Sequence, residues 1–152
     1  MKYILFVFFT FLGGYTVSAQ QEQHVVEQTI LEFFEAFHSK DTLALKALVV
    51  PEIIQQTVVS ASEQMNSVSN GDFNQFVKNI ASIPETTQIK EELLAIETRI
   101  TKGMAHAWTP YVFYVNGAIS HCGVNSFLLV KQNKLWKITH IIDTRTKEGC
   151  SN

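Results

Sequence analysis

The stretch MAHAWTPYVFYVNGAISHCGVNSFLLVK, residues 104–131, decides the fold of this chain. Residues 104–115 are rich in aromatic and β-branched side chains, which favour β-strands. Asn116-Gly117 is a strong signal for a two-residue hairpin turn, and residues 118–131 return as a second strand. The stretch therefore predicts an antiparallel hairpin.

More strands are expected on both sides of this hairpin. A three-residue turn at 132–134 leads into a strand over 135–145, and a turn at 102–103 follows a strand that ends there. Residues 98–101 favour that strand, whereas residues 90–95 are compatible with either strand or helix. The C-terminal half is thus predicted to be an antiparallel meander.

Helices are expected in the N-terminal half. Apolar residues recur at helical spacing over 26–37, which predicts a long amphipathic helix. Asp41 is placed to cap a short second helix that Pro51 stops, and Asp72 is placed to cap a third helix over 73–80.

The segment between the second and third helices carries weaker signals. Residues 53–59 predict a short strand, and the Ser- and Asn-rich residues 60–71 predict a loop, partly helical in an alternative interpretation. Helices first and consecutive strands afterwards predict an α+β fold, in which helices cover one face of a sheet.

Length and charge narrow the class of protein. The chain has 152 residues, 46% of them hydrophobic, and a formal net charge of -2. It is long enough to bury the core of one domain. It has no excess of positive charge that would favour nucleic acid or an anionic membrane as a partner.

The first residues have the pattern of a secretory leader. One positive charge, an apolar run and small residues ending at Ala19 predict cleavage after residue 19, leaving a single domain over 20–152. The apolar run is broken too early for a membrane anchor. We therefore expect an exported protein, periplasmic or extracellular, in which Cys122 and Cys150 are able to pair. In the alternative, Cys122 packs in the core and Cys150 stays free.

Several short motifs lie along the predicted strands: AWTPY at 107–111, FY at 113–114, NG at 116–117, SHCG at 120–123, Phe127, WKI at 136–138 and DTR at 143–145. With the order of the helices, they resemble the SnoaL-like, nuclear transport factor two-like superfamily and, within it, the proposed lumazine-binding branch. The resemblance implies a cone-shaped roll, in which a curved antiparallel sheet packs on three helices around an apolar pocket. It also implies a homodimer. Its members include enzymes and noncatalytic binders, so function must be argued from the site.

The predicted turn lengths set which side chains share a face. They pair Val112 with His121, Phe127 with Thr139, and Lys131 with Leu135. One face then gathers His106, Trp108, Val112, Tyr114, His121, Asn125, Phe127, Thr139, Ile141, Asp143 and Arg145. The opposite face gathers Tyr111, Phe113, Cys122, Val124, Ser126, Leu128, Trp136, Ile138, His140 and Ile142. We predict the first face to line the cavity, because ligand pockets combine apolar walls with a few polar groups. A bulge at Pro110 would move residues 104–109 to the other face.

His121 is the best candidate for proton transfer, with Asp143 on a nearby strand to orient it. The alternative is a hydrogen-bonded strand histidine with no catalytic role. Trp108 and Tyr114 are candidates for a stacking wall and a hydroxyl donor, or else fill the core. The remaining ligand-binding candidates are Asn125, Phe127, His106 and Arg145.

No second carboxylate is placed on this face by the predicted register, which argues against epoxide hydrolysis and ketosteroid isomerisation. His106, His121, His140 and Cys122 have no metal-ligand spacing, so neither a metal nor another cofactor is expected. Three hypotheses stay open: an exported binder of a small apolar or heteroaromatic ligand, a lyase or isomerase, and a noncatalytic dimeric adaptor.

Overall fold

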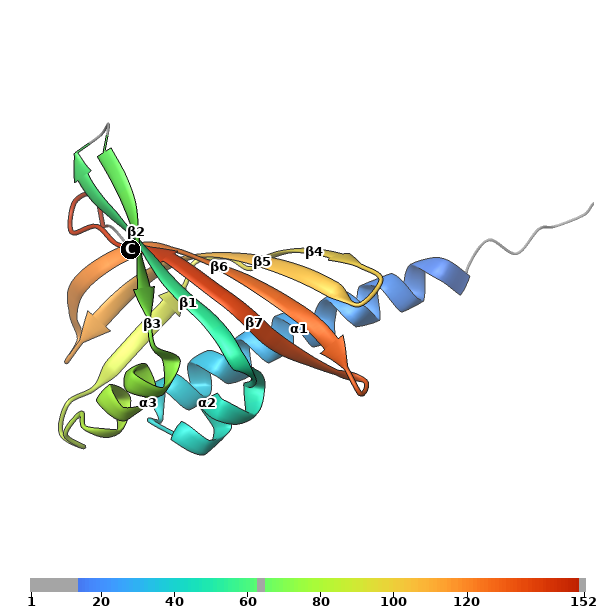
Figure 1. Cartoon of the computed structure of the whole chain (residues 1–152), viewed down its shortest axis with the longest axis horizontal. Helices are drawn as coiled ribbons and strands as arrows, with labels where there is room; N and C mark the ends of the chain where they lie inside the picture. The colour runs from blue at the N-terminus through green and yellow to red at the C-terminus, as the bar shows by residue number, and fades with distance from the viewer. Residues whose placement is uncertain (1–13, 63–64, 151–152) are drawn as a thin grey trace, which may run out of the picture.

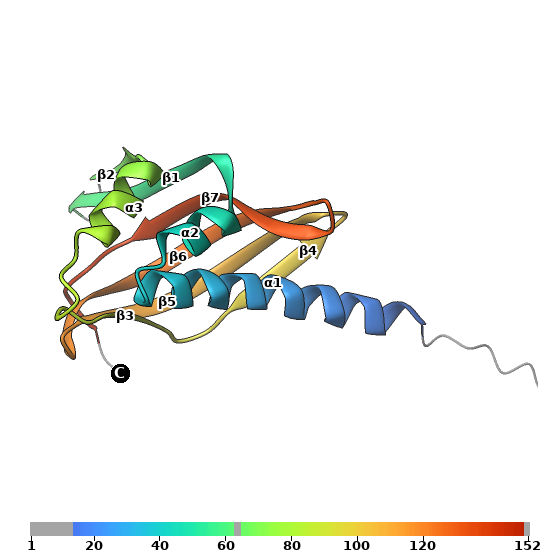
Figure 2. The same ribbon diagram turned by 90° about the horizontal axis from the view of Figure 1, so that it is seen from below.

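The computed structural model describes residues 14–62 and 65–150. Its three helices lie on one side of a single sheet (Figures 1 and 2). The helices are α1 (Gly14–His38), α2 (Thr42–Leu48) and α3 (Phe73–Ala81). The strands are β1 (Val49–Ser62), β2 (Met65–Gly71), β3 (Ile89–Leu93), β4 (Glu97–Thr101), β5 (Met104–Val115), β6 (Ala118–Gln132) and β7 (Leu135–Thr144). The predicted α+β class is confirmed.

The predicted leader spans residues 1–19. Residues 1–13 lie outside the described part of the chain, and residues 14–19 form the beginning of α1. None of the described helices is both long and apolar enough to cross a membrane.

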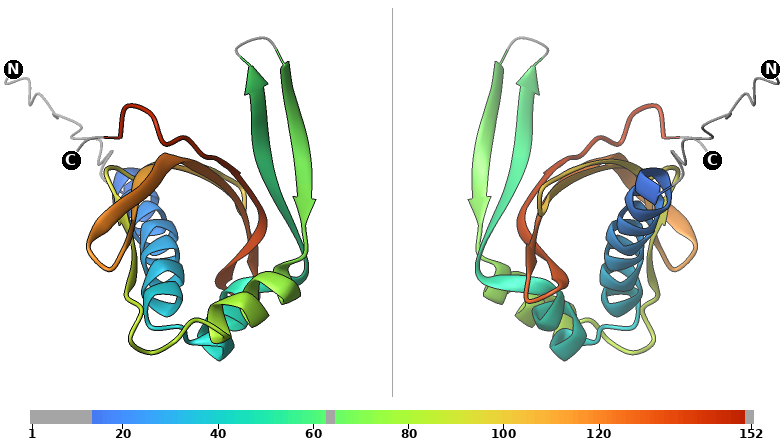
Figure 3. Two further views of the ribbon diagram at one scale, coloured as in Figure 1. Left: turned by 90° about the vertical axis from the view of Figure 1, so that its left-hand side faces the viewer. Right: turned by 90° about the vertical axis from the view of Figure 1, so that its right-hand side faces the viewer.

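The sheet curves around α1 without closing on itself (Figure 3). Its strand order is β2-β1-β7-β6-β5-β3, and β4 pairs with β5 beside β3. The prediction of an antiparallel sheet needs one correction, because β1 and β7 pair in parallel. Only strands joined by a tight hairpin must be antiparallel, and β1 enters the sheet from α2. The sheet is therefore mixed.

The prediction of a loop at residues 60–71 is wrong. Residues of this segment form β2 and the end of β1, with pairs such as Val58 with Val68 and Gln56 with Asn70. The β1–β2 hairpin stands out from the body of the molecule (Figure 3). Its Ser and Asn side chains are largely exposed, so the segment lacks the alternation of apolar residues that marks a half-buried strand.

The core forms where α1 crosses the inner face of the sheet. The buried side chains of α1 follow the predicted helical spacing: Val26, Ile30, Phe33, Phe34 and Phe37. Both predicted helix caps are confirmed, since Asp41 and Asp72 each accept two backbone hydrogen bonds from the first turns of α2 and α3.

A β-bulge in β6 turns β5 over relative to the prediction. Val115 pairs with Ala118 as expected, but Phe113 pairs with His121, which leaves Ser120 as an extra residue in β6. Val112 therefore pairs with Cys122. As a result, Tyr111 and Phe113 face the cone, whereas the predicted cavity residues His106, Trp108, Val112 and Tyr114 lie on the outer face.

Pro110 does not shift the register, since the β5–β6 pairs continue through it. Pro110 lies opposite the gap between β3 and β4, which both pair with the same edge of β5. Its carbonyl accepts a hydrogen bond from Leu94 N, which lies in that gap.

The pairing of β6 with β7 differs from the predicted register in two places. Each difference shifts the pairing by one residue, so beyond the second one the side chains again point to the predicted face. The turn has two residues instead of three, since Gln132 pairs with Leu135, and β7 carries a bulge at Thr139. Ile141 and Asp143 therefore lie on the predicted face, although their partners differ from those predicted. Between the turn and the bulge the prediction is wrong, because Trp136 and Ile138 are buried in the core on the inner face.

The C-terminal segment is fastened to the sheet. Cys122 and Cys150 form a disulfide bond, which decides between the two alternatives left by the sequence. Thr146 also exchanges two backbone hydrogen bonds with Cys122. This segment begins with Arg145, so its attachment helps to place that side chain at the cavity.

Candidate functional site

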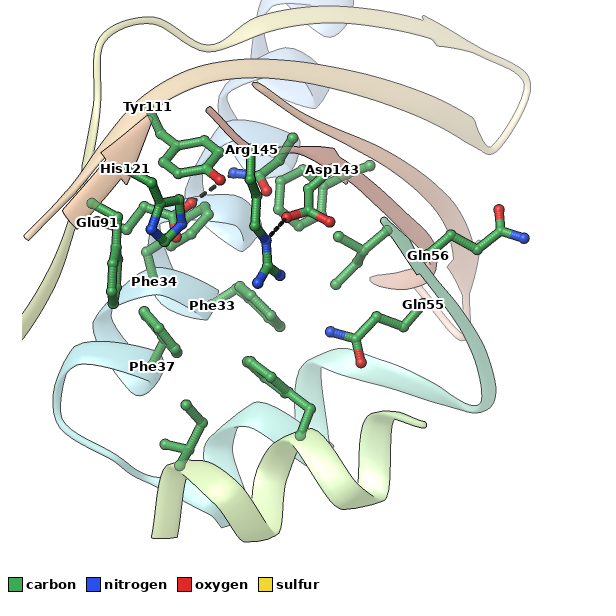
Figure 4. A pocket seen from close by; sticks show the side chains of 16 residues that line it. Phe33, Phe34, Phe37, Gln55, Gln56, Glu91, Tyr111, His121, Asp143 and Arg145 are labelled. Carbon is green, nitrogen blue, oxygen red and sulfur yellow. Dashed lines mark hydrogen bonds and ion pairs between the residues drawn. The ribbon is translucent and has the colours of Figure 1, made fainter. Parts of the chain in front are cut away.

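A cavity of about 200 Å³ lies between the helices and the inner face of the sheet (Figure 4). It is lined by Phe33, Phe34, Phe37, Gln55, Gln56, Phe76, Ile80, Glu91, Tyr111, Phe113, His121, Asn125, Phe127, Ile141, Asp143 and Arg145.

Helix side chains make one wall of this cavity apolar. Phe37 of α1 stacks on Phe76 of α3 with ring centres 5.9 Å apart. Phe33 and Phe34 meet Phe127 of β6 edge to face. Aromatic pairs prefer this edge-to-face geometry, which helps to fix the positions of the rings. The wall follows from the helical spacing that the sequence shows.

Glu91 brings a carboxyl group to the opposite, polar side of the cavity. It lies on β3 and pairs with Phe113, and its Oε1 accepts a hydrogen bond of 2.7 Å from Asn125 Nδ2. Burial raises the pKa of Glu91 to about 7, against the effect of the Asn125 hydrogen bond, and the negative charge of Asp143 raises it further.

The backbone of Glu91 is also held in place. Its N–H donates to His38 Nε2 at 2.7 Å, which requires that nitrogen to be unprotonated. Burial lowers the pKa of His38, which also favours the unprotonated ring.

Sequence reasoning missed Glu91, and the expectation of no second carboxylate on the cavity face is wrong. Residues 89–93 have the alternation of a strand, with Ile89, Glu91 and Leu93 on one side and Lys90 and Glu92 on the other. Recognising this segment as a strand would have placed Glu91 among inward-facing residues.

Asp143 and Arg145 form an ion pair on the same side of the cavity. Asp143 is 7% exposed, and its Oδ1 accepts a hydrogen bond from Thr57 Oγ1 at 2.5 Å. Its Oδ2 accepts one from Arg145 Nε at 2.5 Å. The side chain of Arg145 is 55% exposed. The pair therefore joins a buried carboxylate to a guanidinium at the mouth of the cavity.

His121 lies in the cavity wall without the partner that the sequence suggested. Its ring centre is 4.9 Å from that of Phe113, and its Nδ1 is 3.2 Å from Ser120 Oγ. Burial lowers the pKa of His121, and the positive charge of Arg145 lowers it further. Among the described residues Asp143 bonds to Thr57 and Arg145, not to His121, because Arg145 reaches the carboxylate from only two positions along the chain.

The structure brings five of the predicted site residues together and separates three. His121, Asp143, Asn125, Phe127 and Arg145 line the cavity. On the outer face, His106 Nε2 lies 2.9 Å from Ser126 Oγ, Trp108 is 43% exposed, and the Tyr114 ring lies beneath Lys90. The β6 bulge explains this separation.

Gln55 and Tyr111 were not predicted as site residues. Tyr111 donates its hydroxyl to the Thr144 carbonyl at 3.1 Å. Gln55 comes from β1, and its buried Oε1 has no hydrogen-bond partner within residues 14–62 and 65–150. In the same part of the chain, no group of three or more His, Cys, Asp or Glu side chains is arranged to hold a metal ion.

Solved structures with the same architecture come from several bacteria. An NTF2-like protein of unknown function from Shewanella baltica has a TM-score of 0.62 and 16% identity, covering 85% of this chain and 97% of its own. The fold is that of NTF2-like proteins. A proposed dehydratase of the NTF2-like family from Streptomyces avermitilis has a TM-score of 0.63 and 16% identity, covering 84% of this chain and 98% of its own.

A protein of unknown function from Mycobacterium tuberculosis has a TM-score of 0.71 and 10% identity, covering 91% of this chain and 79% of its own. Comparison with family models and with curated proteins returns no match. At these identities the NTF2-like likeness establishes the fold, and the chemistry must be argued from the cavity.

Proposed function

We propose that this protein binds a small apolar or heteroaromatic molecule inside the cone. The observation that carries the proposal is the cavity itself, which combines a phenylalanine wall with polar groups confined to the sheet side. Ligand sites typically have this composition. The lumazine-binding branch suggested by the sequence motifs remains part of this proposal as one heteroaromatic ligand class.

Filling the cavity tests the proposal. Ile80→Trp places a large ring at a lining position, and Val68→Trp introduces the same side chain on the exposed β2 strand. Native mass spectrometry of the purified proteins, with toluene as the added probe, should detect bound molecules in wild type and Val68→Trp. It should detect none in Ile80→Trp. Equal retention by both variants would place the ligand elsewhere.

A second candidate function is proton transfer by a lyase or isomerase, and Glu91 favours it. A carboxyl group with a pKa of about 7 can both give and accept a proton near neutrality. His121 has a lowered pKa and so stays available as a neutral acceptor beside it. In this candidate function Glu91 replaces His121 as the first proton-transfer group, and Asn125 orients its carboxyl.

Turnover measurements separate this candidate from binding alone. A panel of enolisable ketones and hydroxylated aromatics should show turnover that changes through an apparent pKa near 7 and is lost in Glu91→Gln. His121→Ala would lose activity to a similar extent only if the histidine is the second proton carrier. Retained probe binding with no turnover by wild type would leave the binding function alone standing.

We also propose that the protein is exported and forms a homodimer through the outer face of the sheet. The leader pattern and the Cys122–Cys150 disulfide support export, because such bonds persist in oxidising compartments. Exposed Trp108, Met104 and Ile54 on the outer face support an interface. Light scattering on the wild type and on Trp108→Glu tests the dimer, which the charged variant should dissociate.

A further inference from the structure

Arg145 is held so that one edge of its guanidinium is engaged and the other is directed into the cavity. Asp143 bonds to Nε, and Thr57 holds Asp143 from its other oxygen. In Figure 4 the two terminal nitrogens of Arg145 point away from Asp143, towards the space between Phe33 and Phe37. These Nη atoms have no hydrogen-bond partner among the described residues, so the hydrogen bonds that they can donate remain available to a ligand.

The charged donors of Arg145 are free, whereas the carboxylate oxygens beside them are engaged, and Gln55 adds one unpartnered acceptor, its buried Oε1. Both oxygens of Asp143 and Oε1 of Glu91 already accept hydrogen bonds. Arg145 keeps its Nη donors, and the amide nitrogen of Gln55 points into the cavity in Figure 4. A group that complements these donors must present acceptor oxygens.

Charge and shape restrict that group further. Asp143 neutralises Arg145, and Glu91 in its protonated form adds no charge, so the site holds no net negative charge that would repel an anion. A guanidinium presents its N–H groups in a planar fork that matches the two oxygens of a carboxylate. Its position at the half-exposed mouth keeps the cost of desolvating a second charge low.

We propose that the ligand of this cavity is a small monocarboxylate, bound through its carboxylate to the Nη atoms of Arg145 and through its apolar body to the phenylalanine wall. This inference rests on the binding function proposed above and names the chemical class of its ligand. Gln55 donates a further hydrogen bond to the carboxylate from β1. The cavity volume of about 200 Å³ limits the apolar body to about the size of one aromatic ring.

Three probes of nearly equal shape test the proposal: benzoate, benzamide and toluene. Their affinities for the purified protein are measured by NMR titration at pH 6.5, where Glu91 is mostly protonated. Benzoate should bind at least about tenfold more tightly than benzamide, and Arg145→Gln should lose that preference. Arg99→Gln, an exposed arginine on β4, is the matched control and should bind benzoate as wild type does.

Because Arg145→Gln leaves Asp143 without its charged partner, the double variant Asp143→Asn/Arg145→Gln is measured as well. A folded double variant without benzoate preference supports the proposal. Equal affinity of wild type for benzoate and benzamide, or an undiminished preference in the double variant, overturns the proposal and leaves the binding function intact. Failure of all three probes, toluene included, overturns the binding function and the carboxylate proposal with it.

Discussion

Strand β5 carries two pairs of aromatic residues on opposite faces of the sheet, and they have different roles. Tyr111 and Phe113 line the cavity, and Tyr111 is only 2% exposed. Trp108 and Tyr114 lie on the outer face, where Trp108 keeps 43% of its surface exposed. The pairs are chemically alike, so residue type does not decide which of them serves the cavity. The extra residue Ser120 in the neighbouring strand decides it.

The largest difference between the two faces should appear in stability. Phe127→Ala removes a ring that is 1% exposed and contacts Phe33 and Phe34, so the free energy of unfolding should fall by about 4 kcal/mol. Trp108→Ala on the outer face should cost about 1 kcal/mol or less. Urea unfolding of both variants measures the difference, and similar losses would mean that the outer face is as closely packed as the inner one.

Glu91 should make the stability of the inner face depend on pH. Its pKa of about 7 lies above the ordinary value of 4.5, so its stabilising contribution is complete below about pH 4.5 and is lost as pH rises through 7. The loss amounts to about 3 kcal/mol at 1.36 kcal/mol per pKa unit. Glu91→Gln removes this dependence, so the variant should gain about that much on wild type between pH 4.5 and pH 8.

The comparison with Glu91→Gln is needed because other groups face Glu91: His38, Tyr111, His121, Asp143 and Arg145. The two histidines have lowered pKa values, so their effect on stability has the opposite sign and occurs in both proteins. Urea unfolding at several pH values measures the difference. A constant difference would show that the Glu91 carboxyl is solvated.

Gly123 should tolerate a side chain poorly, because the C-terminal end of β7 passes against it. A Cβ atom added at Gly123 would lie 1.9 Å from the Thr144 carbonyl oxygen. Gly123→Ala should therefore lower the free energy of unfolding by about 2 kcal/mol and weaken benzoate binding, since Arg145 follows the displaced residue. Gly117→Ala, at a left-handed turn position with open space around it, should cost about 1 kcal/mol and leave benzoate binding unchanged.

Tyr111 provides the smallest test. Tyr111→Phe removes the hydroxyl that donates to Thr144 and keeps the ring, so unfolding should become easier by about 1 kcal/mol. Trp108→Phe on the outer face should change stability by less than about 0.5 kcal/mol. Thermal unfolding followed by circular dichroism resolves the two. A Tyr111→Phe variant as stable as wild type would mean that water replaces the lost donor.

The features that the sequence predicted are those set by local interactions. The stripe of α1, the caps at Asp41 and Asp72, and the Asn116-Gly117 turn depend on neighbours a few positions away, and the structure confirms all of them. Together with the strand signals of the C-terminal half, they were sufficient to predict the α+β class.

The polar side of the cavity depends on features that no local pattern marks. The bulges at Ser120 and Thr139 each change the facing of the strand residues beside them. Glu91 lies on a five-residue edge strand too short to show its period clearly. Which partner Asp143 takes depends on Arg145, whose position is set by the attached C-terminal segment.

The parallel pairing of β1 with β7 has a consequence for the order of folding. The hydrogen bond from Thr57 to Asp143 joins residues 86 positions apart, and β1 lies between β2 and β7 in the sheet. On the ribosome, a nascent chain can form the β1–β2 hairpin early but cannot complete the sheet until its last strand has been synthesised. Such long-range contacts slow folding. A chain released before residue 144 should therefore stay unfolded as a whole instead of lacking only its last strand.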